Sequence, residues 1–175
     1  MGVGRWPEGR RQPELDPLLR WPLPEEWSVA EAVAVPYAYS LVYYFLQVKV
    51  KVRAGSSILV HEGSSAIGQA AIRVAAQLGC DPIFTTVGSG RQRALVTELF
   101  PQMEPRYVLS HEDGVSFELA VRRMTRGRGV HLVLNTLGQS KLKATLRCLR
   151  LSGTVLQLNR EGGVDCDGGC LLVER

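Results

Sequence analysis

Short apolar runs alternate with amphipathic stretches through the middle of this chain, and that alternation limits its possible folds more than any other feature. The apolar runs indicate strands, and the longer stretches between them indicate helices. We expect strands at residues 57–61, 82–87, 106–109, 130–135 and 154–158. We expect helices between them at residues 66–78, 91–100, 116–124 and 141–149.

Strands that alternate with helices at this spacing are typical of βαβ units, in which a helix joins two parallel strands. Residues 58–60 and 132–134 of the expected strands are apolar throughout, as strands buried on both faces are. Right-handed crossovers then predict an α/β fold with a doubly wound parallel sheet of the Rossmann type. In such a sheet, a ligand binds in the crevice at the carboxyl ends of the strands.

Both ends of the chain lack this pattern. Residues 1–27 are rich in proline, arginine and glutamate, and we expect an irregular lead-in because proline disfavours helices and central strands. Residues 160–175 are expected to form a loose tail. The sequence therefore predicts one nucleotide-binding Rossmann domain over residues 28–159.

Two helices are expected before the first strand of this domain. Ser28 and Glu31 match a capping box, which predicts a short helix at residues 29–33. Pro36 predicts the start of a second helix at residues 37–48, because proline is favoured in the first helical turn.

The net charge of +4 is unevenly spread. Residues 28–159 carry fifteen basic and eight acidic side chains, whereas both ends of the chain are net acidic. The excess favours an anionic ligand such as a phosphorylated cofactor. We expect no nucleic-acid partner, because no basic stripe interleaved with aromatic side chains and no known nucleic-acid-binding motif is present.

We expect a cytoplasmic protein without a membrane span. No apolar run reaches the ~20 residues needed to cross a bilayer, and the first residues lack the apolar segment of a signal peptide. The four cysteines are too sparse for a disulfide scaffold in 175 residues. Cys166 and Cys170 are four residues apart, but no second pair or nearby histidine completes a zinc site, so we expect no metal.

The strongest motif lies between the first expected strand of the domain and the helix that follows it. Small residues are needed where a backbone passes a pyrophosphate, and free N–H groups at a helix N-terminus attract negative charge. The motif matches a dinucleotide-binding fingerprint, although serine replaces its middle glycine. We predict that its six residues bind the cofactor: Gly63, Ser64, Ser65, Ala66, Ile67 and Gly68.

A second signal follows the next expected strand. Folds that select NAD place an acidic side chain here to bind the ribose, and this segment has none. A hydroxyl and two guanidinium groups suit the 2′-phosphate of NADP(H), although they would also suit an exposed helix start. We favour NADP(H) over NAD(H) and predict cofactor contacts from Thr86, Gly88, Ser89, Arg91 and Arg93.

Other polar residues have two possible roles each. Asn135 and Leu137 follow the strand at 130–135, where Asn135 could hold a ribose or nicotinamide group or could cap a helix. His61, at a strand end, is expected to be structural rather than catalytic. His111 and Asp113 precede a helix, and either could donate a proton or act as a cap. No nucleophile-elbow motif supports a serine hydrolase.

Several collinear segments between residues 19 and 159 resemble the enoyl reductase region of animal fatty acid synthase, and polyketide synthase reductases are similar but slightly more distant. The most specific match is Phe84-Thr85-Thr86-Val87-Gly88-Ser89. Further matches lie at residues 27–29, 35–36, 39–40, 43–44, 58–61, 63–64, 68–71, 116–118, 132–135 and 147–149. These reductases are zinc-free members of the medium-chain dehydrogenase/reductase superfamily.

The resemblance implies NADPH-dependent reduction of a trans-2-enoyl thioester on an acyl carrier protein, with hydride delivered to the β-carbon and a proton to the α-carbon. It implies Asp113 as a proton donor. The lysine donor of the family falls on Gln92, and a threonine that faces the cofactor falls on Leu41. It also implies other domains of a multienzyme, or a homo-oligomer, as partners.

The family has a separate substrate-binding domain, mostly upstream of the cofactor domain, and it continues beyond Asn159. We therefore expect a fragment, a truncated splice product or a degenerate copy. Three functions stay open at this point: a reductase completed by other chains or domains, a non-catalytic module that holds NADP(H) or a partner, and a quinone oxidoreductase of the same superfamily.

Overall fold

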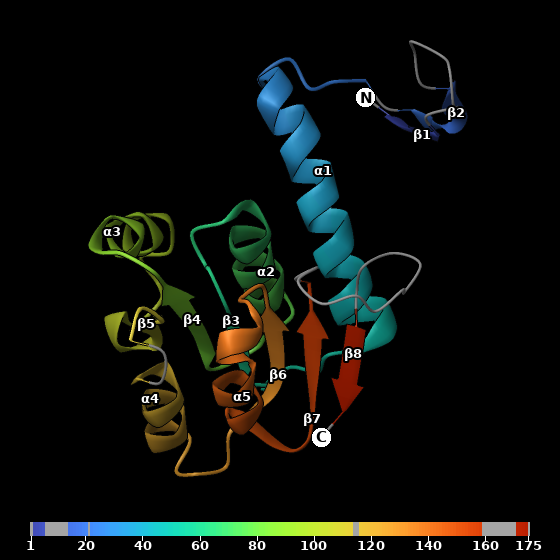
Figure 1. Cartoon of the computed structure of the whole chain (residues 1–175). Helices are drawn as coiled ribbons and strands as arrows, with labels where there is room; N and C mark the ends of the chain where they lie inside the picture. Colours follow the sequence, from blue (N-terminus) through green and yellow to red (C-terminus); the bar gives the residue numbers. More distant parts are fainter. Residues whose placement is uncertain (1, 6–13, 21, 114–115, 159–170, 175) are drawn as a thin grey trace.

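A computed structural model describes residues 2–5, 14–20, 22–113, 116–158 and 171–174 (Figure 1). Its centre is a six-stranded sheet with helices on both faces. The strands are β3 (Ile58–Val60), β4 (Ile83–Val87), β5 (Val108–Ser110), β6 (Val130–Asn135), β7 (Leu149–Gln157) and β8 (Leu171–Glu174). Their order across the sheet is β5-β4-β3-β6-β7-β8.

The strands β3 to β7 are parallel, and the chain reverses its direction of growth at β3. From β3 it adds β4 and then β5 on one side, and it returns to add β6 and then β7 on the other side. The switch point therefore lies between the carboxyl ends of β3 and β6. This topology confirms the predicted doubly wound α/β fold.

Each face of the sheet is covered by a different set of helices. The helices α2 (Ala66–Gln77) and α3 (Gly90–Leu99) share one face with α1 (Val29–Tyr43), and α4 (Ser116–Met124) and α5 (Gln139–Arg147) cover the other. A 3₁₀ turn, η2 (Pro105–Tyr107), leads into β5.

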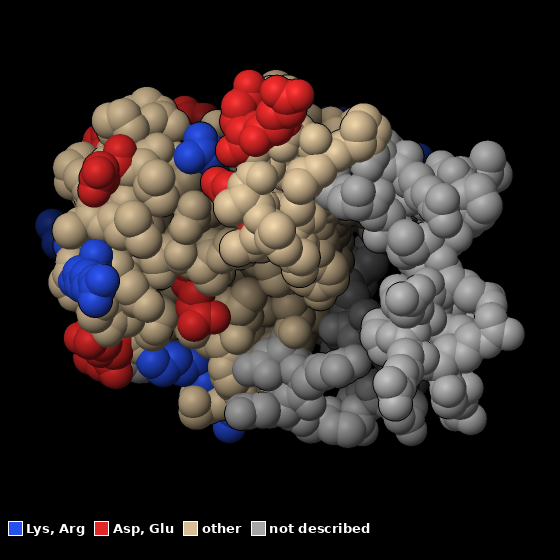
Figure 2. Space-filling model, turned by 90° about the horizontal axis from the view of Figure 1, so that it is seen from above, with Lys and Arg blue, Asp and Glu red and all other residues tan. Residues whose placement is uncertain are grey.

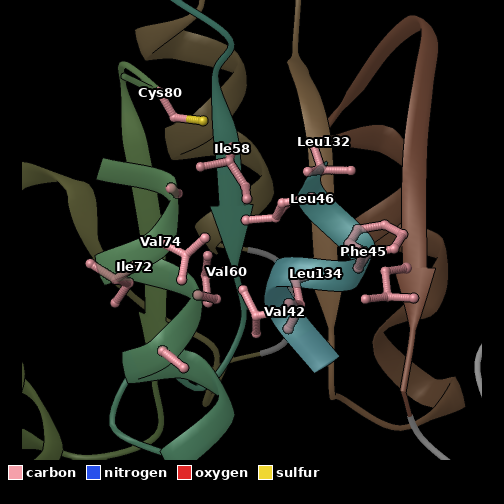
Figure 3. Close-up of a cluster of buried hydrophobic side chains, with 14 of the residues drawn as sticks. Val42, Phe45, Leu46, Ile58, Val60, Ile72, Val74, Cys80, Leu132 and Leu134 are labelled. Carbon is pink, nitrogen blue, oxygen red and sulfur yellow. The ribbon is translucent and has the colours of Figure 1, made fainter. Parts of the chain in front are cut away.

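Successive residues of β3 reach opposite cores, which is why the strand is apolar throughout. Ile58 and Val60 join the cluster under α1 and α2 (Figure 3). Leu59 joins the cluster under α4 and α5 with Phe84 and Val133, its register partners on β4 and β6.

The helix α1 continues without a break into a π-helical segment, η1 (Tyr44–Lys49). The prediction of two helices separated at Pro36 was therefore wrong, because Pro36 lies inside α1. Proline removes one helical hydrogen bond, but the rest of α1 continues on both sides of it. The predicted capping box is confirmed, since the Ser28 N–H donates to Glu31 Oε2 at 2.8 Å and the Glu31 N–H donates to Ser28 Oγ at 3.3 Å.

The continuous helix Val29–Lys49 has 21 residues and is long and apolar enough to cross a membrane by length and composition, which revises the expectation that no segment would be. Its second half is a core element of the sheet domain. Ala38, Val42, Phe45 and Leu46 are buried, and the last three lie among the side chains of the sheet in Figure 3. Packing in the core accounts for the apolar character of that half.

Both ends of the chain contain strands that the sequence did not indicate. The strands β1 (Gly2–Arg5) and β2 (Glu14–Arg20) form an antiparallel pair, and β8 pairs antiparallel with β7. An irregular lead-in and a loose tail were therefore wrong for these residues. A two-stranded sheet leaves an unpaired edge where a proline such as Pro17 is tolerated, and β7 offers an outer edge with unpaired backbone groups.

Truncating Leu46 tests whether η1 is part of the core. Leu46 is fully buried, so Leu46→Ala should lower the free energy of unfolding by about 2–5 kcal/mol through lost burial and a cavity. Val48 lies two residues away and is half exposed, so Val48→Ala should change it by less than about 0.5 kcal/mol. Urea titrations of both variants measure the difference, and equal small effects would contradict the packing of η1.

Candidate nucleotide-binding site

The loops that follow β3, β4, β5 and β6 meet at one edge of the sheet, around the switch point. Figure 2 looks down on this edge and shows basic and acidic side chains interspersed there rather than gathered into one field. Recognition of an anion at this edge therefore depends on individual groups and on backbone N–H donors, not on a broad positive surface.

The fingerprint loop connects β3 to α2 and is held by its own hydrogen bonds. Ser65, at the place of the middle glycine, caps α2, because its Oγ accepts from the Gly68 N–H at 3.0 Å. The Gly63 N–H donates to the Thr86 carbonyl at 3.0 Å, which ties the loop to β4. Ser64, Ala66 and Ile67 lie in the same turn, so the six predicted residues are brought together at the N-terminus of α2.

The two outer glycines are required by close packing. A Cβ on Gly68 would lie 2.3 Å from the Glu62 carbonyl oxygen, and a Cβ on Gly63 would lie 2.1 Å from Thr85 Oγ1. These distances bring the start of α2 against the end of β3. Its first N–H groups therefore face the crevice, as a pyrophosphate site requires.

The β4–α3 loop holds its shape through a reciprocal pair of hydrogen bonds. Ser89 caps α3 by accepting from the Gln92 N–H at 3.2 Å, and Gln92 Oε1 accepts from the Gly88 N–H at 2.7 Å. The Ser89 hydroxyl keeps its proton for a ligand, since its oxygen is the acceptor here. Gln92, at the position of the family's lysine, acts as a structural side chain of this loop.

The two predicted arginines of α3 lie in different surroundings. Arg91 is exposed in the first turn, and within the described part of the chain it makes no ion pair or side-chain hydrogen bond. Arg93 instead donates from Nη1 to the Val108 carbonyl at 2.5 Å, at the start of β5. Arg91 is thus the guanidinium available to a 2′-phosphate, and Arg93 braces α3 against the sheet.

Asn135 is buried, and its side-chain amide makes hydrogen bonds within its own turn and to β7. The Leu137 N–H donates to Asn135 Oδ1 at 3.1 Å, and Asn135 Nδ2 donates to Gln157 Oε1 at 2.6 Å and to the Leu137 carbonyl at 3.3 Å. Asn135 does not cap α5, whose N-cap is Gly138 without a side-chain hydrogen bond. Its side chain instead shapes the loop after β6. Leu137 is buried below this loop.

A network of hydrogen bonds links β4 and α5 to the loops that follow β3 and β5. The His61 ring lies with Nδ1 at 2.9 Å from Thr86 Oγ1 and Nε2 at 3.0 Å from Thr145 Oγ1 on α5. His111 Nδ1 lies 3.1 Å from the same Thr86 hydroxyl. The Thr86 hydroxyl is therefore hydrogen-bonded to two histidine rings and is not free to contact a cofactor. His61 is structural, as expected. The sequence did not indicate Thr145, whose only signal is a threonine on the inner face of a helix.

Charged groups surround the loop after β5. Asp113 accepts from the Ser116 hydroxyl at 2.7 Å and from the Ser116 N–H at 3.4 Å, so it caps α4. These bonds, the side-chain one above all, lower the pKa of Asp113, which keeps it ionised and unsuited to donating a proton. Lys141 Nζ, which the sequence did not indicate, donates to the His111 carbonyl.

The donor set does not fit a zinc ion. In residues 22–113 and 116–158, and in the described strands at the two ends, no three His, Cys, Asp or Glu side chains are grouped to hold a metal. Cys80 and Cys148 are buried and unpaired, and burial raises the pKa of the Cys148 thiol to about 12. Cys166 and Cys170 lie outside the described residues.

A Gly68→Ala substitution tests the close approach of α2 to β3. The added methyl group would meet the Glu62 backbone, which cannot move away as a flexible side chain can, so nucleotide affinity should fall at least tenfold and stability should fall. Gly90→Ala is the matched control, because a Cβ at that position would have no neighbouring atom within 4 Å and alanine favours a helix. Calorimetric titration and thermal unfolding measure both variants, and unchanged binding by the first would contradict this account.

His61 should make stability depend on pH. Burial above all, and then the charges of His111 and Lys141, lower its pKa from 6.5 to about 3, so the unfolded chain binds a proton between these values that the folded chain does not. Stability is therefore complete above pH 6.5 and falls as the pH drops toward 3, by at most about 1.4 kcal/mol per unit.

Replacement by a side chain that does not titrate isolates this effect. His61→Gln should show a smaller change in free energy of unfolding between pH 7 and pH 5 than the wild type, as measured by urea titration at each pH. His111 and His131 remain in both proteins, so their contributions cancel. The same pH dependence in both proteins would show that His61 is not a buried neutral side chain.

The chain matches the zinc-binding dehydrogenase family over residues 66–164. It is 35% identical to the highly reducing polyketide synthase ZEA2 of Gibberella zeae over 78% of this chain, and 34% identical to the lovastatin diketide synthase lovF of Aspergillus terreus over 79%. The matched segments are 6% and 5% of those proteins. The chain therefore spans a small part of its curated relatives.

Solved structures show the same fold. The CurK enoyl reductase superposes with a TM-score of 0.71 at 25% identity, over 82% of this chain and 41% of that one. The nucleotide-binding subdomain of the PpsC enoyl reductase domain from Mycobacterium tuberculosis superposes with a TM-score of 0.63 at 26% identity, over 71% of this chain and 66% of that one. Mycobacterial Rv1454c, solved with NADPH, reaches 0.68 at 26% identity, over 82% of this chain and 43% of that one. With its family match over more than half of its residues and its doubly wound sheet, the chain belongs to the zinc-binding dehydrogenase family.

Proposed function

We propose that this chain is the NADP(H)-binding part of an enoyl reductase that reduces 2-enoyl thioesters in polyketide or fatty acid synthesis. The bound cofactor would supply the hydride for the β-carbon of the enoyl group. The residues of this chain would hold and orient that cofactor at the switch point. Other domains of a multienzyme, and an acyl carrier protein that presents the thioester, are proposed as partners.

The observation that carries the proposal is the pairing of two loops at one edge. The Gly63–Gly68 turn presents the N-terminus of α2, and the β4–α3 loop beside it presents the Ser89 hydroxyl and the free Arg91 guanidinium. The first acidic residue after β4 is Glu98, near the end of α3, so the β4–α3 loop itself offers no carboxylate to a ribose diol. Backbone donors for a pyrophosphate next to an arginine for a 2′-phosphate favour NADP(H).

The relatives support the reaction class. One of the two relatives is named a highly reducing polyketide synthase, and two of the three superposed structures are an enoyl reductase and the nucleotide-binding subdomain of one. Reduction of a 2-enoyl thioester is the chemistry that the fatty acid and polyketide branches share, so we assign that class and not one branch.

A second candidate function is cofactor binding without turnover. The two groups that the family resemblance assigns to proton transfer are both engaged in structural hydrogen bonds here. Asp113 is ionised and caps α4, and Gln92 holds the Gly88 N–H. An enoyl reductase with neither donor would need the α-carbon proton from another group.

Cofactor selectivity is tested by titration with NADPH and NADH, following fluorescence or heat. NADPH should bind at least tenfold more tightly, because charge-assisted hydrogen bonds to the 2′-phosphate contribute about 1.5–3 kcal/mol. Arg91→Ala should remove most of that difference and leave NADH binding unchanged. Arg123→Ala, an exposed arginine in the last turn of α4, is the matched control and should retain the preference. Equal affinity of the wild type for both cofactors would refute the assignment.

Turnover separates the two candidates. The purified chain is mixed with NADPH and a short-chain 2-enoyl thioester, and the absorbance of NADPH is followed. A second reaction contains a quinone in place of the thioester, because quinone oxidoreductases belong to the same superfamily. Thioester-dependent oxidation supports the reductase, and quinone-dependent oxidation alone would reassign the substrate. NADPH binding without oxidation of either kind, both by the chain alone and after a substrate-binding domain of a related enoyl reductase is added, supports the binding module.

A further inference from the structure

His111 stands at the carboxyl edge of the sheet, on the loop that follows β5. Its N–H donates to the Val87 carbonyl at 3.1 Å, which extends the pairing of β5 with β4 by one residue. Its Nδ1 lies 3.1 Å from Thr86 Oγ1, and a Cβ built on Gly88 would lie 2.8 Å from its Nε2. The ring therefore lies across the end of β4, with Nε2 next to the backbone of Gly88.

This position has a consequence for Gly88. Glycine is needed there because the His111 ring occupies the space that a side chain would take. The residues that follow are Ser89, whose hydroxyl proton is free for a ligand, and Arg91, whose guanidinium makes no ion pair or hydrogen bond in the described part of the chain. His111 Nε2 is thus brought to the same loop that the proposed function assigns to the 2′-phosphate.

The hydrogen-bond network below the ring, which joins Thr86 to His61, can accommodate a proton on His111 Nδ1. The Glu62 N–H already donates to Thr86 Oγ1, at 3.3 Å, and that oxygen can accept again from a protonated His111 Nδ1. The single Thr86 hydroxyl proton then goes to His61 Nδ1. His61 carries its own proton on Nε2 and donates it to Thr145 Oγ1. In its charged form His111 therefore leaves every donor and acceptor of Thr86 and His61 paired, and its own Nε2–H remains for a ligand.

The charges that face His111 come from three elements. Burial and then Lys141, from α5, lower its pKa, whereas Glu62, from the β3–α2 loop, and its neighbour Glu112 raise it. His61, which follows β3, stays neutral near neutral pH, because burial lowers its own pKa to about 3. His111 is therefore the side chain of this hydrogen-bond network that titrates. A phosphate dianion beside its Nε2 would favour its charged form.

We propose that protonated His111 binds the 2′-phosphate of NADP(H) through Nε2 together with Arg91, so that this chain prefers NADP(H) over NAD(H) more strongly as the pH falls. The inference rests on the proposed NADP(H) site. The contact adds a second cation to the recognition of the phosphate, and this cation is present only when His111 is charged.

The three histidines of the chain make the test direct. Their ring protons are followed by NMR between pH 5 and pH 8, in the free protein and with saturating 2′,5′-ADP or 5′-AMP, which differ only in the 2′-phosphate. The pKa of His111 should rise by roughly one unit with 2′,5′-ADP, which corresponds to about a tenfold gain in affinity at low pH. His131, at the opposite edge of the sheet, is the internal control and should not shift. No change at His111, or an equal change with 5′-AMP, would overturn the proposal.

Calorimetry with His111→Gln tests the same point through affinity. The 2′-phosphate itself titrates near pH 6, so the informative quantity is the ratio of wild-type to variant affinity for 2′,5′-ADP at each pH. That ratio should rise about tenfold from pH 8 to pH 5, whereas for 5′-AMP, and for His131→Gln, it should stay flat. NADPH binding with a flat ratio would leave the NADP(H) site standing and reject the role of His111. Failure to bind NADPH at all would instead reject the proposed function.

Discussion

The pairing of β3 with both β4 and β6 is the constraint on which the rest of the molecule depends. A central strand has no exposed edge, and its two faces alternate along the chain, so both must be covered by apolar layers. The helices α1 and α2 cover one face, and α4 and α5 cover the other. Because the chain changes direction at β3, the same pairing brings four loops together at one edge and creates the crevice.

The loops at that edge are held mainly by their own polar groups. Ser65 and Ser89 cap helices, Asn135 closes its turn, and Thr86 joins two histidines. In the described part of the chain, no buried side-chain polar atom lacks a hydrogen-bond partner. A site of this kind meets its ligand with little reordering, and backbone N–H groups and a few exposed side chains remain for recognition.

Local patterns predicted most elements, and they failed where a contact distant in the sequence decided the outcome. Pro36 was taken as a helix start, but packing of the following residues on the sheet continues one helix through it. β7 begins at Leu149 rather than at residue 154, because Leu149 pairs with Val130 on β6. The exposed residues 150–152 interrupt the apolar pattern and hide this start of the strand. Arg93 was expected at the cofactor, yet a carbonyl on β5 takes its guanidinium. Lys141 and Thr145 carry no motif, because their roles arise only when α5 packs beside β3.

The sequence alone determined the fold class, the fingerprint turn and the absence of an acidic residue from the β4–α3 loop, because each depends on short-range periodicity or on residue types within a few positions. The tertiary structure decided which polar side chains are free and which are used internally. Ser89 and Arg91 keep donor groups for the proposed cofactor, whereas Asn135, Arg93 and Thr86 are engaged within the protein. That division depends on hydrogen-bond partners contributed by other strands and helices, and no local pattern in the sequence encodes the distance to them.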